Sequence, residues 1–250
     1  MKRGFNFRKF EITYREILTS ISIIAAMLLI GFVISGRISQ SRIDKSEKYN
    51  KAIKIENDKD MFQYGMDTNI GNAFVYGKLK AVDTVTFSEI DGEYMYVEKV
   101  EEHYNMHTET YTTTDSEGNT YVYTRTYWSW DYYDEETKEC KELNFCGVNF
   151  KSNKINLPNS DYICTIDASS FVRFKYYGVN KKLKGTIFTE LRGGTISDSS
   201  PFYDNSNIES TVDALNTSGF AIQIVFWIVW IILIVAVVYG FYYLDNNWLN

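Results

Sequence analysis

The chain has 250 residues, of which 26 are Lys or Arg, 32 are Asp or Glu, three are Cys and 16% are aromatic. This length leaves room for one ordinary folded domain, and the aromatic content argues against a largely disordered chain. The acidic excess grows to about eight charges once the terminal segments are set aside, and it excludes nucleic acid as a favoured partner because phosphate backbones are repelled.

Two runs without charged side chains, 17–34 and 219–244, stand near the ends of the chain. Helices over 18 and 26 residues span about 27 and 39 Å, close to or beyond the ~30 Å hydrocarbon core of a bilayer. We therefore predict two transmembrane helices, a lipid bilayer as partner, and a multi-pass protein of the cell membrane. A cleaved signal peptide is the alternative for the first run, and it would leave the second run as the single anchor.

Five basic residues before the first run favour an amino terminus in the cytoplasm, and two spans then return the carboxyl terminus to the same side. Basic residues also follow this run closely, which reduces the charge difference across it. The predicted organisation is a cytoplasmic tail (1–16), a transmembrane helix (17–34), a stalk or linker (35–66), an extracytoplasmic β-rich domain (67–205), an amphipathic helix (206–218), a second transmembrane helix (219–244) and a cytoplasmic tail (245–250).

Small residues four apart recur in both apolar runs, a spacing that lets helix backbones approach closely in lipid. The pairs are Ser22 with Ala26, Gly31 with Ser35, and Ala236 with Gly240. We expect the two spans to pack against each other, and a homo-oligomeric contact through the same helices stays open.

The segment between the runs changes at about residue 72 to short alternating stretches, which are typical of strands. Strands are predicted at 73–79, 84–88, 94–114, 119–131, 143–150, 163–166, 171–177 and 185–191. The third and fourth are dense in Tyr, Thr and Val, and Asp115-Ser116-Glu117-Gly118 separates them, so they predict a long β-hairpin. The fold class expected is α+β and membrane-anchored: two transmembrane helices flank one mainly antiparallel β domain, a sandwich or partial barrel, with a polar helical stalk.

A short helix is predicted directly before the second span. Ser206 and Glu209 have the spacing of a capping box, and Ile208, Val212 and Leu215 follow at helical intervals. Such an apolar stripe packs on a domain or lies on the bilayer surface.

The segment from Tyr127 to Tyr133 is unusually aromatic. In a strand, Trp128 and Trp130 project to the same face and form either a wall of the core or an exposed stacking platform. If that face is exposed, flat rings beside Tyr127 and Asp131 suit a partner's apolar anchor or a sugar ring. We therefore take Tyr127, Trp128, Trp130 and Asp131 as candidate binding residues.

No catalytic or metal motif stands out in the sequence. His103 and His107 are four positions apart, which in a strand places the rings ~13 Å apart, too far for one zinc ion. Cys140, Cys146 and Cys164 are too few for a disulfide scaffold or a four-ligand zinc site, and we interpret them as small buried side chains, with one disulfide left open. No cofactor or metal is expected.

These patterns predict a non-enzymatic membrane protein whose extracytoplasmic β domain binds another protein, as an accessory or assembly factor would. The alternatives are a membrane-tethered domain that binds glycan through Trp128 and Trp130, and an enzyme of unknown class.

Overall fold

The computed structural model describes residues 4–7 and 10–248, with side chains described for 14–245. The chain divides into two compact units. One joins the two ends of the sequence, Met1–Lys51 and Glu209–Asn250, and the other is Ala52–Ile208. Residues 1–3, 8–9 and 249–250 of the predicted tails lie outside the described residues.

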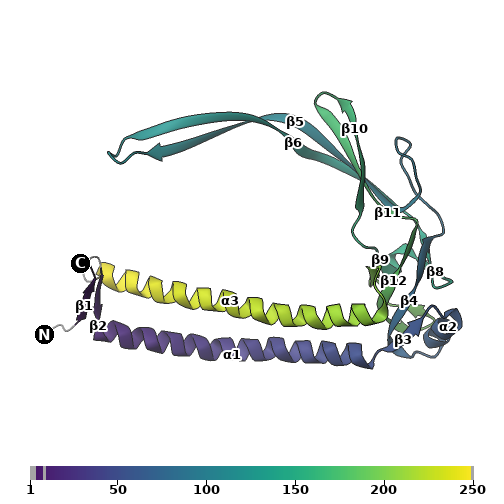
Figure 1. Ribbon diagram of the computed structural model, residues 1–250, viewed down its shortest axis with the longest axis horizontal. Helices are drawn as coiled ribbons and strands as arrows, with labels where there is room; N and C mark the ends of the chain where they lie inside the picture. Colours follow the sequence, from purple (N-terminus) through teal and green to yellow (C-terminus); the bar gives the residue numbers. More distant parts are fainter. Residues whose placement is uncertain (1–3, 8–9, 249–250) are drawn as a thin grey trace. The chain divides into compact units, whose positions relative to one another are not determined.

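The first unit is built from two long helices, α1 (Tyr14–Lys51) and α3 (Ile208–Trp248), which lie side by side and antiparallel (Figure 1). Both are long and apolar enough to cross a membrane, and only 11% and 6% of the residues in their most apolar windows are buried. These helices are therefore unlike the core helix of a soluble protein, whose residues are mostly buried. Two short strands, β1 (Gly4–Phe7) and β2 (Phe10–Thr13), pair antiparallel ahead of α1.

Polar contacts fix the register of α1 against α3 along their length. Ser20 Oγ donates to Tyr242 Oη at 2.9 Å, and Trp230 Nε1 donates to the carbonyl oxygen of Met27 at 3.0 Å. Gly31 and Ser35 are buried in this contact, whereas Ser22, Ala26 and Ala236 are exposed. Of the three small-residue pairs in the sequence, the contact between these helices therefore uses Gly31 with Ser35.

The helix boundaries differ from the sequence prediction at two places. The predicted stalk over 35–66 is wrong beyond Lys51, because strand β3 (Ile53–Glu56) and helix α2 (Lys59–Asp67) belong to the second unit. The predicted amphipathic helix over 206–218 is not separate, because α3 runs without interruption from Ile208 through the apolar run. No proline or left-handed residue stands between Leu215 and Phe220 to end the first segment.

The second unit contains two mainly antiparallel sheets. The larger sheet has the strand order β8-β7-β4-β12-β14-β9, with β3 paired to β4 and β13 paired to β12. Its strands are β3, β4 (Gly71–Ala81), β7 (Glu142–Phe145), β8 (Val148–Lys151), β9 (Ile155–Asn156), β12 (Lys182–Arg192), β13 (Thr195–Ile196) and β14 (Ser200–Asp204), with a 3-10 turn at Ser152–Lys154. The β3–β4 and β9–β14 pairs are parallel, and all other pairs are antiparallel.

Helix α2 covers one face of the larger sheet. Asp58 caps it, because its side chain accepts a hydrogen bond from the Met61 amide at 2.9 Å. Phe62 is fully buried and meets Phe145 and Phe150 at ring-centroid distances of 6.0 and 5.9 Å. These rings belong to the main hydrophobic core, which alternate residues of β4 and β12 complete.

The smaller sheet has the strand order β10-β11-β5-β6. Its strands are β5 (Tyr94–Thr114), β6 (Thr120–Glu139), β10 (Asp161–Ser169) and β11 (Val172–Asn180). β11 pairs with β5 only as far as His103, so the rest of β5 and its partner half of β6 continue as a two-stranded ribbon (Figure 1). We call this ribbon, residues 104–130, the β5–β6 arm.

Most of the predicted strands are confirmed, and one is wrong. β5 has the predicted bounds, β6 is eight residues longer at its carboxyl end than predicted, and the stretch 143–150 divides into β7 and β8. The predicted strand at 84–88 is a loop with a single bridge between Val85 and Tyr94. Its Phe87 is buried against Val97 and Tyr176, so packing rather than strand pairing explains the apolar residues there.

Candidate functional site

The four predicted binding residues all lie on β6, but on two faces of the β5–β6 hairpin. Trp128 pairs with Met106 and Trp130 with Tyr104, whereas Tyr127 pairs with His107 and Asp131 with His103. Because side chains alternate along a strand, the two tryptophans share one face while Tyr127 and Asp131 occupy the other. The structure therefore divides the predicted site into two surfaces.

The tryptophan face carries a row of rings that we call the aromatic ladder: Tyr104, Trp128, Trp130 and Phe171. Tyr104 stands between the tryptophans, with ring-centroid distances of 5.3 Å to Trp128 and 5.1 Å to Trp130. Phe171, from the turn between β10 and β11, lies 6.1 Å from Trp128. Trp128 is 47% exposed and Phe171 is 56% exposed, so this face is a surface and the interpretation as a wall of the core is wrong.

Charged side chains lie against the Trp130 end of the aromatic ladder. The Arg173 guanidinium lies 4.2 Å from the centre of the Trp130 ring, and Arg173 Nε donates to Glu102 Oε2 at 2.6 Å. Lys175 Nζ donates to the other oxygen of Glu102 at 2.9 Å. Burial alone would raise the pKa of Glu102, but the hydrogen bonds from Lys175 and Arg173 outweigh it and lower that pKa. Trp130 is thus covered by a cation, and Trp128 remains the accessible tryptophan.

The opposite face carries a hydrogen-bonded polar group centred on Asp131. Its carboxylate accepts from Asn105 Nδ2 at 3.0 Å and Ser129 Oγ at 2.9 Å, and contacts His107 Nε2 at 2.7 Å. These hydrogen bonds, led by that from Asn105, lower the pKa of Asp131. Ser129 donates to the carboxylate and not to a histidine, so the arrangement does not activate a serine nucleophile.

His103 and His107 lie on this same face of β5 and bind different carboxylates. His103 Nε2 contacts Glu101 Oε1 at 2.6 Å, and its ring stacks on Tyr133 with centroids 4.0 Å apart. The His107 ring stacks on Tyr127 at 5.3 Å. Among residues 14–245, no group of three or more His, Cys, Asp or Glu side chains is placed to hold a metal ion.

The three cysteines are free thiols, with Cys140 and Cys146 buried and Cys164 half-buried. Burial raises the pKa of Cys140 to about 11 and raises that of Cys146 as well. Thiols with raised pKa values stay protonated at neutral pH and are weak nucleophiles, so these two serve as packing groups.

The outer half of the arm exposes aromatic and apolar side chains on both faces. Tyr111, Tyr121, Val122 and Tyr123 are all exposed, and the Tyr111 and Tyr123 rings stack with centroids 5.6 Å apart. Glu109 and Arg125, which pair across the strands, are the only residues of the arm strands that carry a full charge at neutral pH. In the described part of the chain, β6 is an edge strand with no partner on its outer side.

Two members of the aromatic ladder come from β5 and from the turn before β11. Tyr104 could have been found from the sequence, because hairpin pairing on either side of the turn at 115–118 places it opposite Trp130. No local pattern points to Phe171, because it reaches the ladder only through the pairing of β11 with β5.

Comparisons with models of protein families, with curated proteins and with solved structures find no match to this chain.

Proposed function

We propose that this chain is an integral membrane protein, held by α1 and α3 with both termini in the cytoplasm, whose extracytoplasmic β domain binds another protein through the β5–β6 arm. Two helices of spanning length with mostly exposed apolar side chains support the membrane anchorage. Five basic residues before the first apolar run support the orientation. The curled larger sheet, in which we infer a partial barrel, belongs to the same unit as the smaller sheet from which the arm extends.

The observation that carries the proposal is the exposure of the arm. A two-stranded ribbon with apolar side chains on both faces, few charges and a free edge is a template for pairing with another chain. In contrast, the inner half of β6 carries the acidic residues Asp134, Glu135, Glu136 and Glu139, which discourage strand addition there. We infer that the partner adds an extended segment to the outer edge of residues 120–130 and places an apolar side chain against Trp128.

A photo-crosslinking residue at Val122 in the full-length protein, activated in intact membranes, tests this inference. We expect one defined protein adduct, which Thr124→Lys with Thr126→Lys abolishes because a charged edge repels strand addition. Thr137→Lys, in the acidic half of the same strand, is the matched control and should leave the adduct unchanged. The proposal would be contradicted if a crosslinker at Thr137 gave as much adduct as one at Val122, or if a crosslinker at Val122 gave no adduct.

A separate measurement tests the anchorage. The protein should stay in the membrane pellet after extraction with alkaline carbonate, and protease added to intact cells should cleave the β domain. Release into the carbonate supernatant would contradict the membrane assignment, but it would not bear on the proposed binding by the β5–β6 arm.

A glycan is the second candidate ligand, because Trp128 is 47% exposed. A sugar stacks on a free ring face, whereas the rings of the aromatic ladder already lie against one another, with Trp128 inclined 24° to Tyr104. A protein anchor that packs against ring edges fits this arrangement better. Sugar retention unchanged by Trp128→Ala with Trp130→Ala, in a folded protein, would remove this candidate.

A homo-oligomeric contact through the helices remains a prediction. Ser22, Ala26 and Ala236 are exposed and leave small-residue surfaces on the helix pair that a second copy could contact.

A further inference from the structure

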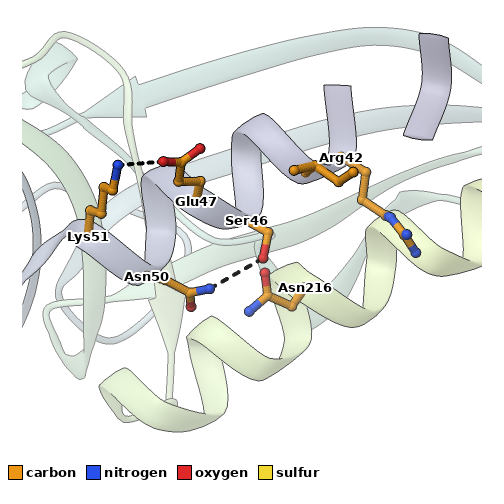
Figure 2. Close-up of a pocket in the computed structure, with 7 residues that line it drawn as sticks. Arg42, Ser46, Glu47, Asn50, Lys51 and Asn216 are labelled. Atoms are coloured by element: carbon orange, nitrogen blue, oxygen red, sulfur yellow. Dashed lines mark hydrogen bonds and ion pairs between the residues drawn. The ribbon is translucent and has the colours of Figure 1, made fainter. Parts of the chain in front are cut away.

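The helix pair carries a polar hollow where the apolar run of α3 begins. A pocket of about 530 Å³ lies between α1 and α3, and Figure 2 shows its lining. The polar residues around it are Arg42, Ser46, Glu47, Asn50, Lys51 and Asn216. All belong to the unit formed by the two helices.

Arg42 in this lining, and Lys45 in the lining of a smaller adjoining hollow, have no carboxylate partner among the described side chains. Glu47, the acid in the lining, forms an ion pair with Lys51, which leaves Arg42 and Lys45 without an ion pair. The Arg42 guanidinium instead lies 5.7 Å from the centre of the Phe220 ring. The position therefore has an uncompensated positive charge, which favours an anionic ligand.

The backbone of α3 is shaped to accept Arg42. A Cβ atom at Gly219 would lie 2.9 Å from Arg42 Cγ, so the absence of a side chain lets the Arg42 stem cross α3 at this position. The guanidinium is thus held at the pocket by packing as well as by the Phe220 ring.

Asn216 contributes an unsatisfied hydrogen-bond acceptor to the site. Its Oδ1 atom is buried and accepts no hydrogen bond from the described residues, and Figure 2 shows the side chain directed toward Ser46 across the pocket. Asn50 Nδ2 donates to Ser46 Oγ at 3.5 Å, and neither side chain donates a hydrogen bond to Asn216 Oδ1. A buried acceptor without a donor is costly, and it favours a ligand that brings a hydroxyl or ammonium hydrogen.

A second hollow of about 100 Å³ shares Arg42, Ser46 and Asn216 with the first and adds Leu215 and Ile222. This second lining also includes the polar residues Lys45, Tyr49 and Ser218, and its apolar residue Ile222 lies within the apolar run of α3, which begins at Gly219. In a bilayer spanned by this pair, both hollows lie at the level of the headgroups, because they stand where the apolar run of α3 begins.

We propose that this interhelical pocket binds a phosphate group attached to a hydrogen-bond donor, as in the headgroup of an anionic glycerophospholipid. Arg42 and Lys45 bind the phosphate, and Asn216 Oδ1 accepts from the donor. The lipid as the source of this phosphate rests on the membrane anchorage proposed above, whereas a soluble phosphate ester would present the same chemistry.

Thermal stability of the full-length protein tests the proposal. In nanodiscs, phosphatidylglycerol should stabilise the protein more than phosphatidylcholine, which has neither net charge nor a headgroup donor. Arg42→Met keeps the aliphatic stem and removes the charge, and it should weaken phosphatidylglycerol binding about tenfold or more. Arg42→Lys should retain part of the binding, because it keeps the charge but not the bidentate geometry. Arg37→Met, exposed on the same helix outside both hollows, is the matched control and should bind like the wild type.

Asn216→Ala tests whether Asn216 accepts a hydrogen bond from the donor on the ligand. It should reduce the preference for phosphatidylglycerol over phosphatidic acid, whose headgroup lacks the glycerol hydroxyls. If Asn216→Ala left the preference for phosphatidylglycerol over phosphatidic acid unchanged, the role of Asn216 as an acceptor would be overturned.

Glycerol phosphate added to the protein in detergent distinguishes the two sources. Binding that depends on Arg42 and competes with phosphatidylglycerol supports a soluble ester, and binding of the lipid alone supports the headgroup. The proposal would be overturned if Arg37→Met lost as much binding as Arg42→Met. It would also be overturned if Arg42→Met changed the binding of neither phosphatidylglycerol nor glycerol phosphate. If carbonate extracted the protein while Arg42-dependent binding of glycerol phosphate persisted, the anchorage would fail and the site would stand.

Discussion

At the scale of single residues, Gly31 is the more closely surrounded of the two glycines of α1. A Cβ atom there would lie 2.4 Å from Trp230 Nε1, the atom that donates to the carbonyl oxygen of Met27. The missing side chain therefore allows both the close approach of the helices and the hydrogen bond of the indole. Gly36, one turn further along α1, has no atom within 4 Å of its Cβ position.

Gly31→Ala should lower the stability of the helix pair, because the indole must move and its hydrogen bond is lost. We expect a cost of about 1–3 kcal/mol, measured as a lower melting temperature of the detergent-solubilised protein. Gly36→Ala is the matched control and should be neutral or stabilise α1 by about 0.5–1 kcal/mol, because alanine favours helix more than glycine. Equal effects of the two substitutions would contradict the packing described for Gly31.

Glu102 makes the stability of the β domain depend on pH. Its pKa is lowered in the folded protein, so its ionised form contributes stability above the ordinary pKa of glutamate, 4.5, and this stability is lost as the pH falls below that value. Glu102→Gln should therefore destabilise the domain at neutral pH and reduce the decline in melting temperature between neutral and acidic pH. A melting profile in which the variant and the wild type decline in parallel would contradict this assignment.

At the scale of elements, the β5–β6 hairpin is the part of the fold that local sequence specifies best. Asp115 Oδ1 accepts from the amides of Glu117 and Asn119 at 2.9 Å each, and Gly118 adopts a φ of +88°. These residues set the turn, and the turn sets the register that brings Tyr104 opposite Trp130. The hairpin and its register follow from local chemistry, whereas the exposure of its faces does not.

Gly118→Val should loosen the tip of the arm, because a β-branched residue is strained at this φ. We expect the amides of residues 110–124 to exchange hydrogen about tenfold faster, while the melting temperature of the domain stays nearly constant. Ser116→Ala, in the same turn, should leave exchange unchanged. Slower exchange at the tip, or a loss of stability throughout the domain, would contradict a local role for the turn.

At the scale of the whole molecule, the two units obtain their packing from different parts of the chain. The main core of the β domain draws its buried residues, from Ile55 to Phe202, entirely from the second unit. The helix unit instead joins residues more than 200 positions apart, such as Ser20 with Tyr242. The β domain therefore has a core that does not require the helices.

The fragment Ala52–Ile208 should fold alone, because it contains this core and both sheets. We expect a β-type circular dichroism spectrum and cooperative thermal unfolding. A fragment that is unfolded under conditions where the full chain melts cooperatively would contradict the independence of the domain.

The sequence alone determined the features that depend on local pattern. Uninterrupted apolar runs predicted the two long helices, and alternation with turn residues predicted most strands and the hairpin, since each signal lies within a few neighbouring residues. Tertiary structure decided which faces are covered. Trp128 is exposed because β11 pairs with β5 only as far as His103, and Phe171 joins the aromatic ladder through the same long-range pairing. The pocket at Arg42 and Asn216 likewise exists only because two helices distant in sequence pack antiparallel, and no local pattern encodes that contact.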